Sequence, residues 1–101
     1  MKILTLITHS DSQQTLADLL RSQSSVTGFT FTHVEGHGAQ GERDAFLSPL
    51  DRVVGYVPHV RVDILLNDTE VADVLTALHK SSHGTGRSVY WVTEVIQQGR
   101  L

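Results

Sequence analysis

The chain has 101 residues, 40% of them hydrophobic, which predicts one ordinary globular domain over residues 1–101 and leaves no room for a second. Eight basic and eleven acidic residues give a formal charge of −3 without a basic stripe, which argues against nucleic acid or an anionic membrane as partner. Because cysteine is absent, disulfides, thiolate metal sites and cysteine nucleophiles are excluded.

The first predicted element is a strand over residues 2–8, rich in β-branched side chains. This apolar run is too short for a secretory signal, so we expect a cytoplasmic protein. Ser10 with Gln13, or Asp11 with Gln14, has the spacing of a helix-capping box. A helix up to about residue 23 is predicted by the leucines that follow at helical spacing: Leu16, Leu19 and Leu20.

A second strand is predicted over residues 29–35, where side chains alternate between two faces. One face carries Phe29, Phe31 and His33, and the other carries Thr30, Thr32 and Val34. Residues 37–57 follow neither a helical nor an alternating pattern and include several glycines. A loop of this length is uncommon in so small a domain and is usually functional.

Residues 60–66 alternate as a third strand, residues 71–80 carry an apolar stripe at helical spacing, and residues 87–96 form a last strand. The order β-α-β-β-α-β predicts a ferredoxin-like α+β domain, with a four-stranded antiparallel sheet, two helices on one face and a long loop between the second and third strands. The other face needs a cover, so we expect self-association through Phe29 and Phe31, or alternatively through Tyr90 and Trp91.

Two glycine-rich segments at strand ends are candidate anion sites. Residues 36–41 have alternating glycines, and residues 84–87 read Gly-Thr-Gly-Arg, which places a cation beside a flexible turn. Plain turns between elements explain both segments equally well. No nucleophile, base and acid stand in a recognisable catalytic pattern, so an enzyme is the least favoured class.

Six histidines invite a metal hypothesis, since neutral imidazole is a common metal ligand. His33 and His37 straddle the end of the second strand. His79 and His83 are four residues apart, the spacing that places two rings on one face of a helix. For each of them, a solvated or hydrogen-bonded side chain is the alternative interpretation.

Residues 28–40, GFTFTHVEGHGAQ, resemble the strand-two signature of PII signalling proteins, in which a glycine, a hydrophobic residue and a threonine lead to a Gly-x-Gly-x-Gln exit. Residues 51–64 are similar to the segment that returns from the long loop of that family, with Pro58 opening the third strand. Residues 84–87 stand where the family carries a phosphate-binding turn. The resemblance covers nearly the whole chain and looks closest to a diverged PII-like branch, some of whose members are associated with heavy-metal efflux systems.

The resemblance implies a regulatory homotrimer whose sheets face its centre and whose long loop docks on a target protein, such as a membrane transporter or efflux system. It also implies that a small anionic ligand, such as a nucleotide, binds in a cleft between subunits. The effector-binding residues would be Gly28, Thr30, Gly38 and Gln40 of one subunit and Gly84, Gly86 and Arg87 of its neighbour. The alternative is a metal-binding or metal-responsive trimer linked to metal tolerance, using some of His33, His37, His79 and His83.

Overall fold

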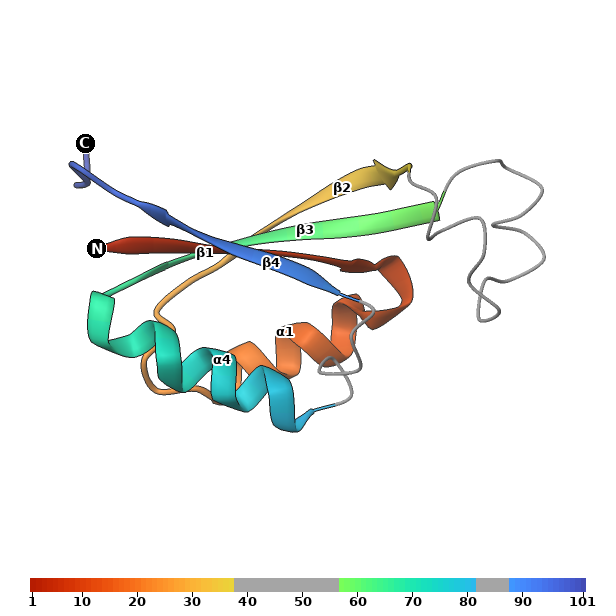
Figure 1. Cartoon of the computed structure of the whole chain (residues 1–101), viewed down its shortest axis with the longest axis horizontal. Coiled ribbons are helices and arrows are strands. Elements are labelled where there is room, and N and C mark those ends of the chain that lie inside the picture. Colours follow the sequence, from red (N-terminus) through yellow and green to blue (C-terminus); the bar gives the residue numbers. More distant parts are fainter. Residues whose placement is uncertain (38–56, 82–87) are drawn as a thin grey trace.

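The computed structural model describes residues 1–37, 57–81 and 88–101. In these residues a four-stranded antiparallel sheet of order β2-β3-β1-β4 has both helices on one face, which confirms the predicted ferredoxin-like α+β fold (Figure 1). The strands are β1 (Lys2–His9), β2 (Thr30–Gly36), β3 (Val57–Leu66) and β4 (Val89–Glu94). The helices are α1 (Gln13–Ser22) and α4 (Val71–Lys80), preceded by the 3₁₀ turns η1 (Ser10–Ser12) and η2 (Asp68–Glu70).

Every strand boundary lies within two residues of the predicted one except the start of β3. β3 begins at Val57, earlier than the predicted residue 60, because Val57 and Pro58 pair with the last residues of β2. β4 ends at Glu94, whose partner Lys2 is the first residue of β1, so the ladder stops there. Except for its two end residues, the predicted loop 37–57 lies outside the described residues.

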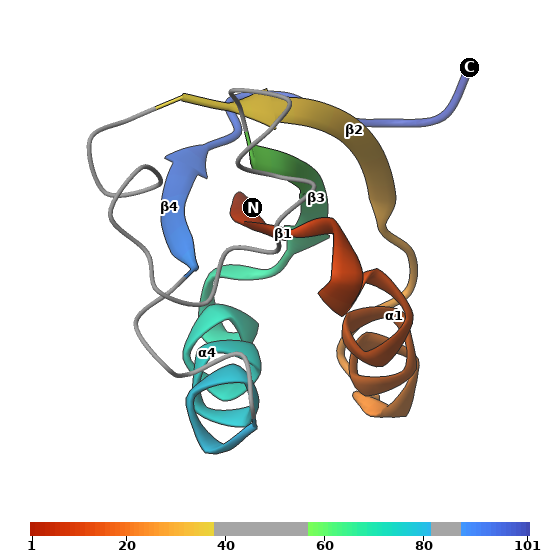
Figure 2. The same ribbon diagram turned by 90° about the vertical axis from the view of Figure 1, so that its right-hand side faces the viewer.

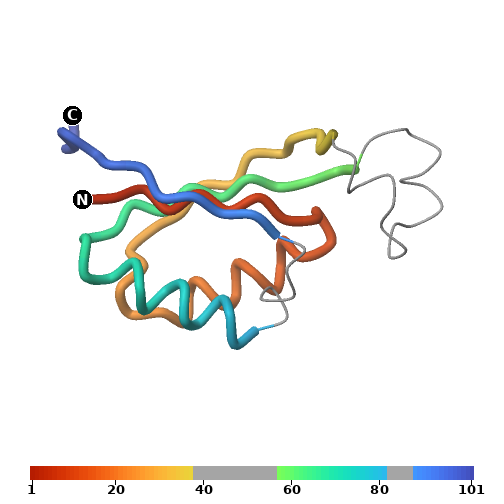
Figure 3. Tube along the Cα trace, in the orientation of Figure 1, coloured from red at the N-terminus to blue at the C-terminus, as the bar shows by residue number. Residues whose placement is uncertain are grey.

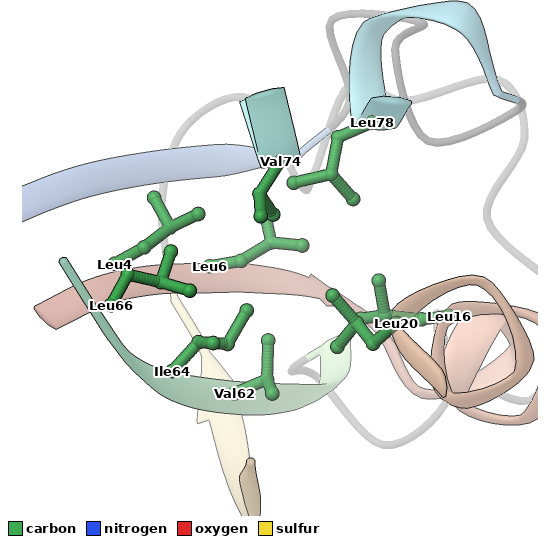
Figure 4. Packing of buried hydrophobic residues seen from close by; sticks show 9 residues of the cluster. All are labelled: Leu4, Leu6, Leu16, Leu20, Val62, Ile64, Leu66, Val74 and Leu78. Atoms are coloured by element: carbon green, nitrogen blue, oxygen red, sulfur yellow. The ribbon is translucent and has the colours of Figure 1, made fainter. Parts of the chain in front are cut away.

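The core lies between the sheet and the two helices. Both helices lie side by side under one face of the sheet, here called the helix side (Figure 2). Figure 4 shows the nine side chains of the central cluster, from β1, β3, α1 and α4: Leu4, Leu6, Leu16, Leu20, Val62, Ile64, Leu66, Val74 and Leu78. Each fully buried aliphatic side chain contributes about 1.5–3 kcal/mol relative to an exposed one.

Phe29 and Phe31 also pack against this cluster, edge to face with ring centroids 5.6 Å apart. They therefore lie on the helix side. The prediction that Phe29 and Phe31 cover the opposite face of the sheet is wrong. No described element covers that opposite face, here called the outer face (Figures 1 and 2). Figure 3 follows the chain through the four strands, of which β2 and β4 are the two edge strands of the sheet (Figure 2).

In the three described stretches, no helix combines the length and the apolar character needed to cross a membrane.

Candidate functional site

A pocket of about 460 Å³ lies at the end of the sheet where β2 finishes and β3 begins. This volume falls in the range of small-molecule sites, about 300–1,000 Å³. The pocket, here called the strand-end pocket, combines side chains of the η1–α1 junction with those of β2 and β3: Ser10, Gln13, His33, Val34, Glu35, Pro58 and His59. A ligand there would touch the two strand ends that residues 38–56 connect.

The side chain of His59 in this pocket is oriented by a bond to the backbone. Its Nδ1 lies 2.9 Å from the carbonyl oxygen of Val57. Since a carbonyl can only accept, this bond needs the proton on Nδ1, and the neutral ring then offers Nε2 as an acceptor. A Cβ on Gly36 would lie 2.1 Å from His59 Nδ1, so the absence of a side chain at Gly36 lets the imidazole lie against the backbone of β2.

Other histidines gather at the same end of the sheet. His9 pairs with His59 across β1 and β3, with ring centroids 6.2 Å apart. The Nδ1 of His9 accepts a hydrogen bond of 3.1 Å from the amide of Asp11. His37 Nε2 lies 3.2 Å from a carboxylate oxygen of Glu35. The sequence did not predict that His9 and His59 are neighbours, because only the register of β1 against β3 reveals it.

The structure does not bring the predicted metal-binding histidines together in one protomer. His33 and His37 lie on or next to the edge strand β2. His79 lies at the end of α4, where its ring packs edge-on against Tyr90 of the opposite edge strand, with centroids 6.4 Å apart. His83 lies outside the described residues. Within residues 1–37, 57–81 and 88–101, no three histidine or carboxylate side chains form a group that could hold a metal ion.

The predicted effector-binding residues are described only in part. Thr30 is the first residue of β2 and pairs with Asp63 of β3 on the outer face. Gly28 precedes β2, and a Cβ built there would meet nothing within 4 Å, so the protomer alone gives no reason for glycine at this position. The remaining predicted residues lie outside the described part of the chain: Gly38, Gln40, Gly84, Gly86 and Arg87.

A polar network occupies the middle of the outer face. Thr5 Oγ1 donates a hydrogen bond of 2.7 Å to Asp63 Oδ1, and Arg61 Nε donates one of 3.0 Å to Asp63 Oδ2. The guanidinium carbon of Arg61 lies 5.8 Å from the ring centroid of Trp91. Thr5 is only 1% exposed, although no layer formed by the described residues covers this face. The cation of Arg61 is therefore already paired with a carboxylate and stacked on an indole.

This network changes the ionisation of Asp63. Partial burial disfavours the charged carboxylate, but the hydrogen bonds from Arg61 and Thr5 and the positive charge of Arg61 outweigh it and lower the pKa of Asp63 below its ordinary 3.8. Because these polar groups bond one another, a partner could cover this part of the sheet without leaving them unpaired.

Large apolar side chains surround the network. Leu65, Val89 and Trp91 are 36%, 56% and 42% exposed, and their strand positions place them on the outer face. Tyr90 and Trp91 were the alternative pair predicted for this face, and of these two Trp91 lies on it. Tyr90 lies on the helix side, because it pairs with Leu6 of the core. The outer face therefore combines exposed aromatic and aliphatic side chains with a central polar group of residues that hydrogen-bond one another. This combination is suited to a protein contact.

Comparisons with known proteins place the whole chain in one family. The model of the family described as "Protein of unknown function (DUF3240)" matches residues 1–101. The crystal structure of a DUF3240 family protein from Shewanella baltica OS155 is similar in fold, with a TM-score of 0.76 and 23% identity, over 99% of this chain and 94% of the other. No curated protein matches the chain.

Proposed function

The chain belongs to the DUF3240 family of proteins of unknown function, and we propose that it is a PII-like regulatory homotrimer of the cytoplasm that binds a small effector and performs no catalysis. Its outer faces turn toward one another in the trimer, and the segment between β2 and β3 contacts a target protein such as a membrane transporter or efflux system. The resemblance of residues 28–40, 51–64 and 84–87 to PII proteins is the basis for the threefold assembly.

The observation that carries this proposal is the uncovered outer face. A helix-on-sheet layer buries only one face of the sheet, and monomers rarely leave large apolar surfaces in water. Trp91 and Val89 are about half exposed there, while the charges of Arg61 and Asp63 are already paired. Contact with further copies would remove the apolar side chains from water at little cost to the polar ones.

The strand-end pocket supports the regulatory part of the proposal. An effector bound among its imidazole, amide and hydroxyl groups would touch β2 and β3 at the residues from which the long connection leaves and to which it returns. A ligand with different affinities for two arrangements of that connection would shift the balance between them. Residues 84–87 of a neighbouring subunit, which end in Arg87, would contact the phosphate groups of the effector.

The expected assembly can be measured directly. Light scattering coupled to size exclusion should give three times the chain mass of 11.1 kDa, unchanged across micromolar dilution. A mass of one chain at every concentration would reject the trimer, and with it the intersubunit effector cleft. A mass of two chains would retain self-association but reject the PII-like arrangement.

A second candidate, metal binding, is favoured by the histidines at this end of the sheet: His33 and His59 line the strand-end pocket, His9 lies beside His59, and His37 lies 3.2 Å from Glu35. Since the described residues hold no ready group of three ligands, a metal would draw a further ligand from a neighbouring subunit or from the rest of the chain.

One pair of titrations distinguishes the two candidates. If the effector is a nucleotide, calorimetry should detect ATP, and Arg87→Ala should weaken its binding by roughly tenfold or more, while Arg21→Ala on the exposed surface of α1 should not. If the ligand is a metal, zinc or copper chloride should raise the melting temperature of the wild type but not that of a His33→Ala, His37→Ala variant. Lys80→Ala, a change at an exposed position at the end of α4, is the control. Absence of any response to either ligand would reject both effector assignments.

A further inference from the structure

The strand-end pocket combines a carboxylate with several neutral polar groups. The described residues that line it include one acid, Glu35, and neither a lysine nor an arginine. Residues 84–87, the segment that the sequence assigns to an anion, end instead in Arg87. Because the local charge of a pocket attracts ligands of the opposite sign, the strand-end pocket favours a positively charged ligand over a phosphate.

One wall of the pocket is the end of the edge strand β2. His33 and Glu35 are two residues apart in this strand, so both point to the same face of the sheet. They lie opposite Val60 and Pro58 of β3. Val60 is a fully buried core residue, which puts the imidazole of His33 and the carboxylate of Glu35 on the helix side.

The opposite wall is the start of the first helix. Ser10 is the first residue of η1 and Gln13 is the first residue of α1, and η1 packs against β3. Within the described part of the chain, the side chains of Ser10, Gln13 and His33 form no hydrogen bond, so their polar atoms can serve a ligand. Asp11, in the first turn of η1, offsets the partial positive charge that a helix start carries.

The carboxylate of Glu35 keeps acceptor capacity for a ligand. One of its oxygens lies 3.2 Å from Nε2 of His37. A carboxylate offers about four acceptor positions, so this contact leaves most of them open. The side chain of Glu35 is 62% exposed, so a ligand can reach it from solvent. A hydrogen bond between a carboxylate and an ammonium group is one of the strong kinds.

A metal ion is the competing cation, but the pocket is poorly equipped for one. A transition metal usually takes three or four ligands from protein side chains. Within residues 1–37, 57–81 and 88–101, no three histidine or carboxylate side chains form such a group. The volume of about 460 Å³ also exceeds what a single ion fills and leaves space for an organic chain.

We propose that the strand-end pocket binds an alkylammonium group, that is, a primary amine on an apolar chain. Glu35 supplies the counter-charge, and the oxygens of Gln13 and Ser10 accept further N–H bonds. Val34 and Pro58 contact the alkyl chain. The ligand is either a free amine or a lysine side chain of a partner protein. All these groups belong to one chain, so binding does not need the trimer, whereas regulation by such a ligand rests on the proposed function.

Titration of the isotope-labelled full chain, followed by nuclear magnetic resonance, tests this assignment. Putrescine represents a free amine and Nα-acetyl-lysine amide represents a lysine side chain. Both should shift the backbone amide signals of Ser10, Gln13 and His33, whereas the neutral butanediol and the anionic succinate should not. The tighter of the two amines identifies the source of the ligand.

Two substitutions of opposite sign make the test specific. Glu35→Gln keeps the size of the side chain but removes its charge, and should weaken amine binding by roughly tenfold or more. Asp73→Asn, at an exposed position of α4, removes the same charge elsewhere and should leave binding unchanged. Gln13→Glu adds a second carboxylate and should tighten binding by roughly threefold or more. A gain of affinity cannot result from a damaged fold.

The possible failures are distinguishable. An absence of shifts with both amines, or equal shifts with succinate, would overturn the proposal. A response to zinc chloride without a response to the amines would also overturn it and make the pocket a metal site. A monomer that binds the amines would refute the trimer but support this assignment, and a trimer that does not bind them would do the reverse.

Discussion

Replacing Ile64 with alanine is expected to lower the free energy of unfolding by about 3 kcal/mol, within the range of roughly 2–5 kcal/mol found for such truncations in filled cores. Ile64 is 0% exposed and lies in the cluster between the sheet and both helices. β3 pairs with β1 and β2, so neither the backbone nor the helices can easily move into the space left by the side chain. Urea unfolding at fixed protein concentration measures the change.

Ile96 provides a control of the same residue type. It follows β4 and is 99% exposed, so Ile96→Ala should change the free energy of unfolding by less than about 0.5 kcal/mol. Equal losses from the two substitutions would mean either that Ile64 is not in a filled core or that Ile96 is buried by a partner. The oligomeric mass of the Ile96→Ala variant separates these two explanations.

The fold could be predicted from the sequence because its signals are local. Leucines at helical spacing mark α1, and the alternation of Val60, Val62 and Ile64 with polar residues marks β3. The same alternation correctly put Phe31 and Thr32 on opposite faces of β2. The alternation alone put the start of β3 at residue 60, whereas the resemblance put Pro58 at its opening, and in the structure Pro58 occupies a strand position opposite Glu35.

The site was harder to predict because its contacts join residues distant in sequence. His9 and His59 are neighbours only through the register of β1 with β3, and the close approach of His59 to Gly36 depends on the register of β2 with β3. Similarly, Tyr90 and Trp91 are adjacent in sequence and were considered together for the outer face. The pairing of β4 with β1 puts them on opposite faces of the sheet.

Arg61 shares a face of β3 with His59, which lines the strand-end pocket, but its guanidinium is paired with Asp63. Its position stabilises the outer face instead of leaving a cation available to a ligand. Asp63 accepts hydrogen bonds from Arg61 of its own strand and from Thr5 of β1, so this carboxylate adds a side-chain bond between β1 and β3 to their backbone ladder.

Removal of this carboxylate should therefore be costly. Asp63→Ala leaves the hydroxyl of Thr5, which is 1% exposed, without its acceptor and the guanidinium of Arg61 without its counter-charge. We expect a loss of about 1–3 kcal/mol in the free energy of unfolding at neutral pH, the usual cost of an unsatisfied buried polar group. Thr32→Ala, a neighbouring change on the outer face at an exposed position of β2, should cost less.

The pH dependence of stability provides an independent test of the same contact. Because the pKa of Asp63 is lower in the folded chain than its ordinary 3.8, the unfolded chain binds the proton first, and the ionised carboxylate stabilises the fold at all pH values above that range. This contribution is lost as the pH falls below about 4 and through the folded pKa. Urea unfolding between neutral and strongly acidic pH should therefore show a smaller acid-induced loss for Asp63→Asn than for the wild type. Parallel curves for the two proteins would mean that the bonds from Arg61 and Thr5 do not favour the ionised form.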